Sequence, residues 1–169
     1  MVSNPMADTL ILYEGRYGHS QRAAEIVNAT VLKESACFPA DEAAESLDDV
    51  KNILLVVGFL AYDTAKKLKP YLERNQEELK DKTIGMVGVG LAQQALPAFV
   101  KIIEKSMNRN VDGSWFAMGG YQVEDLTPQD RKMLEEFWAK QGLPLKDQEY
   151  FEESQIMEIA EQIAVLFDK

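Results

Sequence analysis

The chain has 169 residues, of which 46% are hydrophobic and 27% are charged, and its formal net charge at pH 7 is −10. This length suits one well-packed core, so we expect a single domain over residues 1–169. The negative charge repels the phosphates of nucleic acids and anionic membranes, which excludes a general affinity for either. No apolar run is long enough to span a bilayer, so we expect no membrane span.

The sequence has few histidines and cysteines that could bind a metal, and no recognisable sorting signal at residues 1–6. Residues 1–6 lack the basic and apolar regions of a signal peptide. The single cysteine, Cys37, fits a small core position and a reducing compartment, so we expect a cytoplasmic protein. With one histidine, His19, and one cysteine, the sequence predicts neither a metal site nor a Cys–His catalytic pair.

Apolar, strand-like runs alternate with segments of helical period, a pattern typical of a parallel sheet with crossover helices. The first predicted strand is Thr9–Tyr13, and the helix after it carries Ala24, Val27 and Val31 on one face. A short run, Ala36–Pro39, is the predicted second strand.

The clearest strand lies in the middle of the chain, at Asn52–Gly58. Its continuous apolar character indicates burial on both faces, as in the centre of a parallel sheet. The segment before it, Asp41–Leu47, is predicted as a small helix or turn. The segment after it, Ala65–Leu79, has a helical pattern that Pro70 interrupts, so we expect a kink or a late start there.

Two further strands follow, Thr83–Val89 and Ser114–Met118, and the pair Gly119-Gly120 is expected to stop the second of them. Between them, Leu96–Met107 has the apolar spacing of a helix, with Pro97 tolerated in its first turn.

The C-terminal part is predicted to hold two helices. Thr127 and Pro128 form a good helix start, and Gly142 is a good stop. The residues that this helix is expected to bury are Met133, Leu134, Phe137 and Trp138. After a polar loop through Asp147, the final helix carries an apolar side made of Ile156, Ile159, Ala160, Ile163 and Phe167.

The loop between the first strand and the first helix carries the main chemical signal. It reads Glu14-Gly15-Arg16-Tyr17-Gly18-His19-Ser20 and opens a helix. Unpaired backbone N–H groups gather at a helix N-terminus, which makes such a loop a binding site for phosphate. In doubly wound sheets, ligands bind beyond the C-terminal ends of the strands, and this loop lies at such an end.

This segment resembles the flavodoxin signature in its spacing throughout. The matching positions are Ile11, Leu12, Tyr13, Gly15, Gly18, Ser20, Ala24 and Val27. The resemblance extends more loosely over most of the chain, in the group that also includes the flavodoxin-type protoporphyrinogen oxidase. It implies a five-stranded doubly wound parallel sheet of order 2-1-3-4-5, with helices on both faces, and FMN as a cofactor bound through its phosphate.

The same resemblance implies three groups of FMN-binding residues. The phosphate loop supplies Gly15, Arg16, Tyr17, Gly18, His19 and Ser20. The loop after the central strand supplies Phe59, Leu60, Ala61 and Tyr62, and the next strand end supplies Gly88, Val89 and Gly90. It assigns no catalytic residue.

Three features depart from the family pattern. Gly15 stands where the family usually has a hydroxyl, which removes one donor to phosphate. Phe59 and Leu60 replace a small hydroxyl residue and proline, and Glu14 adds a negative charge beside the proposed phosphate. One hypothesis is that Arg16 replaces the donor that is missing at position 15, because a guanidinium can donate two hydrogen bonds to phosphate at once.

Three functions therefore remain open. The first is an FMN-binding, flavodoxin-like protein in electron transfer, whose acidic surface would steer a redox partner with a basic surface. The second is an FMN-dependent oxidoreductase acting on a small aromatic substrate, quinone-like or porphyrin-like. The third is a flavodoxin-like binding module that has lost its flavin, which the departures at Gly15 and at Phe59-Leu60 favour.

Overall fold

Five parallel strands form the sheet in the order β2-β1-β3-β4-β5 in the computed structural model, which describes residues 8–30, 35–43, 46–59 and 65–168. The strands are β1 (Thr9–Glu14), β2 (Ser35–Pro39), β3 (Asn52–Gly58), β4 (Thr83–Gly90) and β5 (Gly113–Met118). This arrangement confirms the predicted fold class and strand order. The predicted strand limits agree with the observed ones to within one residue at each end.

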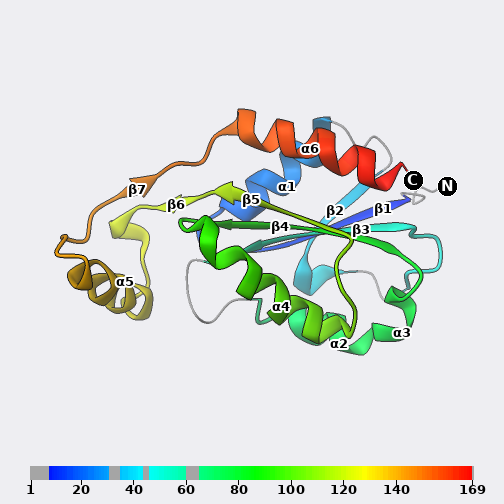
Figure 1. Cartoon of the computed structure of the whole chain (residues 1–169), viewed down its shortest axis with the longest axis horizontal. Coiled ribbons are helices and arrows are strands. Elements are labelled where there is room, and N and C mark those ends of the chain that lie inside the picture. The colour runs from blue at the N-terminus through cyan, green and yellow to red at the C-terminus, as the bar shows by residue number, and fades with distance from the viewer. Residues whose placement is uncertain (1–7, 31–34, 44–45, 60–64, 169) are drawn as a thin grey trace.

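Helices cover both faces of the sheet (Figure 1). On one face lie α1 (His19–Thr30) and α6 (Glu153–Phe167). On the other face lie α2 (Leu68–Arg74), α3 (Gln76–Leu79) and α4 (Leu96–Met107). The sheet is therefore doubly wound, as its strand order requires.

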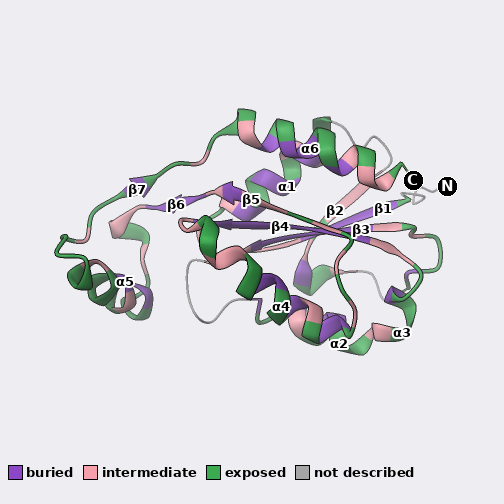
Figure 2. Ribbon diagram, in the orientation of Figure 1, coloured by how far each residue is buried: buried purple, intermediate pink, exposed green. Residues whose placement is uncertain are grey.

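The central strand shows why the core has two halves. In β3, Ile53, Leu55 and Val57 pack with α2 and α4, whereas Leu54 and Val56 pack with α1 and α6. Successive side chains of a strand point to opposite faces, so a strand buried on both faces must be apolar at every position. Figure 2 shows this burial as a continuous purple band through the central strands.

The predicted helix at Ala65–Leu79 is two short helices in the structure. The first, α2, begins at Leu68, so Pro70 falls in its first turn, where a missing N–H costs little. The chain then breaks at Asn75, whose side chain donates to the Tyr71 carbonyl oxygen at 2.7 Å. The late start is confirmed, and the further break comes from this local side-chain bond. In the predicted Asp41–Leu47 segment, a 3-10 helix spans Ala40–Glu42, and residues 44–45 lie outside the described residues.

Residues 119–150, which we call the α5 arm, leave the sheet after β5 (Figure 1). Within the arm, β6 (Gly120–Tyr121) and β7 (Gln148–Glu149) pair antiparallel, and α5 (Pro128–Lys140) lies beyond the end of the sheet. A Cβ on Gly120 would lie 2.3 Å from the Gln148 carbonyl oxygen, so this ribbon requires glycine there. The expected loop through Asp147 is present, and β7 begins directly after it at Gln148. Two-residue strands are too short to show a period of two.

The start and stop of α5 agree with the sequence. The Thr127 hydroxyl accepts the Asp130 N–H at 3.1 Å, and Gly142 follows the helix with φ of +73°. The expected burial of its apolar face is only partly correct, because Leu134 is buried whereas Phe137 is 48% exposed. The helix does not lie on the sheet, so its outer face has no layer to pack against.

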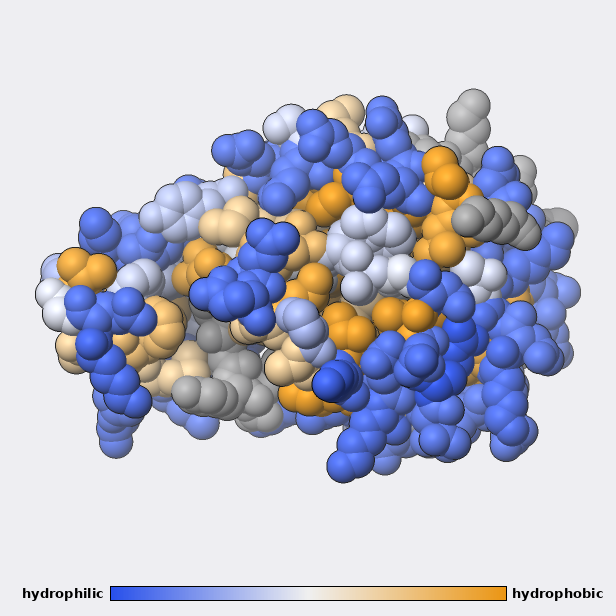
Figure 3. Space-filling view, viewed as in Figure 1, coloured by the Kyte–Doolittle hydropathy of each residue, from blue (hydrophilic) through white to orange (hydrophobic). Residues whose placement is uncertain are grey.

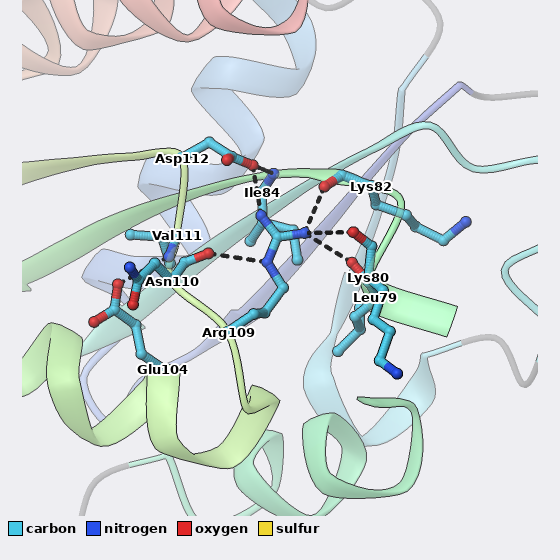
Figure 4. Close-up of polar contacts among 9 residues, drawn as sticks. All are labelled: Leu79, Lys80, Lys82, Ile84, Glu104, Arg109, Asn110, Val111 and Asp112. Carbon is cyan, nitrogen blue, oxygen red and sulfur yellow. Dashed lines mark hydrogen bonds and ion pairs between the residues drawn. The ribbon is translucent and has the colours of Figure 1, made fainter. Parts of the chain in front are cut away.

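At the opposite end of the sheet, Arg109 ties three segments together (Figure 4). Its Nη1 donates to the Leu79 and Lys82 carbonyl oxygens at 2.8 and 2.7 Å. Its Nη2 donates to the Asp112 carboxylate at 2.8 Å, and that carboxylate also accepts the Ile84 N–H at 2.8 Å. One half-buried guanidinium therefore fixes the end of α3, the start of β4 and the turn before β5.

Cys37 lies in the edge strand β2, where burial raises the pKa of its thiol to about 11 from 9.0. The reactive form is the thiolate, and at pH 8 a thiol with a pKa of about 11 has a roughly 100-fold smaller thiolate fraction than one with a pKa of 9.0. We expect iodoacetamide to alkylate Cys37 in the folded protein roughly 100-fold more slowly than in urea-unfolded protein at that pH. Equal rates, measured by mass spectrometry, would show that the thiol is not protected.

The surface is mainly hydrophilic on the face shown in Figure 3, with a few apolar patches. None of the helices within the described ranges is long and apolar enough to cross a membrane.

Candidate functional site

The site is built at the end of the sheet where the parallel strands reach their C-termini. The register sets Glu14 of β1 opposite Val57 of β3, and Gly90 of β4 opposite Met118 of β5. The loop that enters α1, the segment after β3, the end of β4 and the α5 arm therefore all meet at this edge. It is the edge at which doubly wound sheets bind ligands.

The loop of residues 15–18 turns the chain from β1 into α1. Gly18 adopts φ of +89°, a conformation that side chains with a Cβ strongly disfavour. Apart from its two chain neighbours, no described residue has an atom within 4 Å of the position where a Cβ would stand, so the glycine borders open space. It is followed directly by α1, whose first N–H groups have no intrahelical acceptor. The glycine turn predicted from the sequence is therefore present in the expected place.

The absent hydroxyl at position 15 has a structural cause. Ser20 is 2% exposed, and its Oγ lies 2.6 Å from the position of a Cβ on Gly15. The same oxygen lies 3.1 Å from a Cβ position on Gly58 at the end of β3. The Ser20 side chain thus fills the space between the two glycines, and it leaves no room for a side chain at position 15.

Substituting Gly15→Ser should therefore destabilise the protein. The new Cβ would lie 2.6 Å from the Ser20 Oγ and 2.9 Å from its Cβ, and overpacking of this kind costs about 1–3 kcal/mol. Thermal unfolding of Gly15→Ser and of the double variant Gly15→Ser/Ser20→Ala measures the effect, and the double variant should recover part of the loss. A Gly15→Ser protein as stable as the wild type would contradict this packing.

Glu14 turns away from the loop and caps a helix. Its carboxylate accepts the Leu68 N–H at 2.9 Å and the Lys67 N–H at 3.1 Å. These donors are the N-cap residue and the first residue of α2, where a negative charge is favoured. The charge expected beside the phosphate is therefore engaged on the α2 side of the loop.

Arg16 and Tyr17 both contact Asp130 in the first turn of α5. The Arg16 guanidinium forms an ion pair with the Asp130 carboxylate, and the Tyr17 hydroxyl donates to the other carboxylate oxygen. Burial and the adjacent Asp130 carboxylate raise the pKa of Tyr17 above 10.0. Asp130 is 2% exposed, and sequence reasoning did not identify it as a site residue.

His19 and Arg22 make a second set of contacts, on the α6 side of the loop. His19 Nε2 lies 2.8 Å from Glu149 Oε1 in β7. Arg22 pairs with Glu153, and its guanidinium lies 5.5 Å from the centre of the Phe151 ring. The single histidine therefore joins the first residue of α1 to the α5 arm.

Next to these residues, the surface has a hollow of about 440 Å³. It is bounded by aromatic side chains and by carboxylates of the arm and α6. The residues that line it include Tyr17, His19, Tyr121, Asp125, Glu149 and Phe151. Tyr121 is 1% exposed, and its hydroxyl accepts the Trp138 Nε1–H at 2.8 Å, so it is fixed as one wall.

The segments after β3 and β4 pack against each other. The Phe59 ring stacks on Phe99 with centroids 4.9 Å apart, and it lies over Gly88 and Gly90. A Cβ on either glycine would come within 2.9 Å of this ring. The backbone N–H of Phe59 donates to the Val89 carbonyl oxygen at 3.0 Å. Phe59 thus belongs to the α4 side of the core, and the predicted contacts Leu60, Ala61 and Tyr62 lie outside the described residues.

A family model described as a flavodoxin domain matches residues 10–142, which include the loop, β3, β4 and most of the α5 arm. The chain belongs to the flavodoxin domain family. The predicted family is thereby confirmed. No curated protein matches the sequence.

Solved structures that are similar to this chain have low sequence identity to it. The two-electron reduced flavodoxin of Megasphaera elsdenii is 19% identical, with a TM-score of 0.51 over 64% of this chain and 84% of that one. The Trp repressor binding protein of Bacillus subtilis is 14% identical, with a TM-score of 0.48 over 66% and 82%. A mutant of Fusobacterium nucleatum flavodoxin, bound to flavin mononucleotide, is 16% identical, with a TM-score of 0.46 over 69% and 70%.

Proposed function

We propose that this flavodoxin domain binds FMN noncovalently and transfers electrons between partners. The observation that carries the proposal is the loop at Gly18, open to solvent at the start of α1 and at the C-terminal end of β1. Such a loop suits a phosphate dianion, because its N–H groups and the helix dipole favour negative charge. A bound FMN would supply the redox chemistry.

The residues of the loop fit the phosphate half of this cofactor. The first N–H groups of α1 would donate to the phosphate, and Arg16 would place a cation beside it. The Glu14 carboxylate accepts backbone N–H groups at the start of α2, which would offset part of its repulsion of the phosphate. For the flavin ring, Leu60, Ala61 and Tyr62 of the second loop remain the proposed contacts.

The test is to purify the protein and record its absorption spectrum. We expect a yellow preparation that releases FMN when it is heated. A colourless preparation that fails to quench the fluorescence of added FMN would overturn the proposal and favour the module without flavin.

The partner is proposed to be a redox protein with a basic surface. The chain carries a net charge of −10, and Asp125, Glu149 and Glu153 line the hollow beside the loop. Opposite charges accelerate encounter, and salt suppresses that effect. Electron transfer to a basic acceptor at a rate that does not fall with added salt would argue against this partner.

We also propose that the protein is cytoplasmic and that residues 1–169 form a single domain.

A second candidate is a flavin-dependent reductase of a small aromatic substrate. The hollow of about 440 Å³ favours it, because Tyr17, Tyr121 and Phe151 give it aromatic walls. Turnover of a quinone by the flavin-loaded protein with NADH or NADPH would support the reductase. Reduction of a protein acceptor without quinone turnover would support the carrier.

A further inference from the structure

Asp130 is a buried carboxylate that the α5 arm places against the phosphate loop. It is 2% exposed, and both of its oxygens are engaged: Oδ1 by the Arg16 guanidinium and Oδ2 by the Tyr17 hydroxyl. Its backbone N–H is capped by the Thr127 hydroxyl at 3.1 Å. The Asp130 side chain is therefore held by the loop, and its backbone is held by the N-cap of its own helix.

The arm and the loop also meet at two other points. The Thr127 N–H lies 3.4 Å from the Tyr17 hydroxyl, and His19 Nε2 lies 2.8 Å from the Glu149 carboxylate. Every one of these contacts joins residues of the loop to residues more than one hundred positions later in the chain. The α5 arm therefore contacts the loop and the first residue of α1 at several points.

Two roles for this carboxylate predict opposite effects. As a competitor, Asp130 would occupy Arg16 and Tyr17 and would leave when a phosphate arrives. As a positioning group, it would stay and hold both side chains for the phosphate. Burial decides between them, because a buried carboxylate stripped of its partners is strongly destabilised.

We propose that Asp130 is a positioning residue for the flavin phosphate, holding Arg16 and Tyr17 in the geometry that the phosphate requires. The inference rests on the proposed function and deepens it. It also makes the α5 arm part of the flavin site. If the arm must be in place for the phosphate to bind, then phosphate binding stabilises the arm in that position by the same free energy.

The test compares FMN with riboflavin, which has the same ring and no phosphate. We expect Asp130→Asn to weaken FMN binding about tenfold and to change riboflavin binding by less than about twofold. Glu124→Gln is the matched control, since it removes one exposed carboxylate of the same arm. It should leave both affinities within about twofold of the wild type.

Tyr17→Phe is the second variant, in case Asp130→Asn does not fold. It removes one of the two contacts to the carboxylate and keeps the ion pair, so a smaller loss confined to FMN is expected. Unchanged or tighter FMN binding in the folded variants would overturn the proposal, as would an equal loss for FMN and riboflavin. A wild-type protein that binds neither flavin would instead refute the proposed function.

Protection of the arm gives a readout that is independent of turnover. Arg131, Lys132 and Lys140 are exposed trypsin sites on α5. FMN should slow cleavage at these sites in the wild type, riboflavin should slow it less, and the difference should disappear in Asp130→Asn. Cleavage that FMN does not slow in the wild type would contradict the coupling.

Discussion

Replacing Arg109 with alanine should lower the free energy of unfolding by about 3 kcal/mol, since bonds to a charged donor each contribute about 1.5–3 kcal/mol and are not fully additive. The guanidinium is 17% exposed and binds the Leu79 and Lys82 carbonyl oxygens as well as Asp112. Without it, these acceptors at the end of α3 and the start of β4 lose a shared donor (Figure 4). Urea unfolding followed by circular dichroism measures the loss.

Arg131→Ala is the control for loss of one positive charge. Its side chain is 52% exposed and pairs with Glu135 at 3.3 Å on the surface of α5. Exposed pairs of this kind contribute about 0.2–1 kcal/mol, so the expected change is small. If both variants unfold at the same urea concentration, the Arg109 cluster does not stabilise the fold as proposed.

Replacing Gly18 with valine should weaken FMN binding by roughly 10- to 100-fold while the fold persists. A β-branched residue is strongly disfavoured at φ of +89°, so the loop must rotate a peptide, and one N–H then turns away from the phosphate. The lost hydrogen bond to a charged acceptor accounts for the size of the effect. Fluorescence quenching of FMN measures it.

Gly142→Val separates backbone strain from phosphate binding. Gly142 also has a positive φ, of +73°, and also has no atom within 4 Å of its Cβ position, but it lies after the C-terminal end of α5. The same strain there should leave FMN affinity within about threefold of the wild type. Equal losses in the two variants would mean that Gly18 acts through stability alone.

Most of the fold could be predicted because burial on both sheet faces leaves a continuous apolar run. The β3 run at Asn52–Gly58 shows this, and the crossover pattern then limits the topology to few arrangements. The β6–β7 ribbon could not be predicted, because each of its strands has two residues. The exposure of Phe137 could not be predicted either, because the apolar pattern of a helix does not say whether another layer of the fold covers that side of the helix.

The glycine turn before α1 could be predicted from its spacing, whereas the residues that contact it from the α5 arm could not. Asp130 reads in sequence as an ordinary acidic residue in the first turn of a helix. Its partner Arg16 lies 114 positions earlier, and only tertiary folding brings the two together. In the same way, the glycine at position 15 looks like a lost donor until Ser20 is seen to fill its place.

The most direct measurement is a fluorescence titration of flavin-free wild-type protein with FMN and with riboflavin at the same salt concentration. The structure predicts saturable binding of FMN at least about tenfold tighter than that of riboflavin, because the loop at the start of α1 recognises the phosphate. Equal affinity for the two flavins, or no binding of FMN, would contradict the assignment of this loop as a flavin phosphate site.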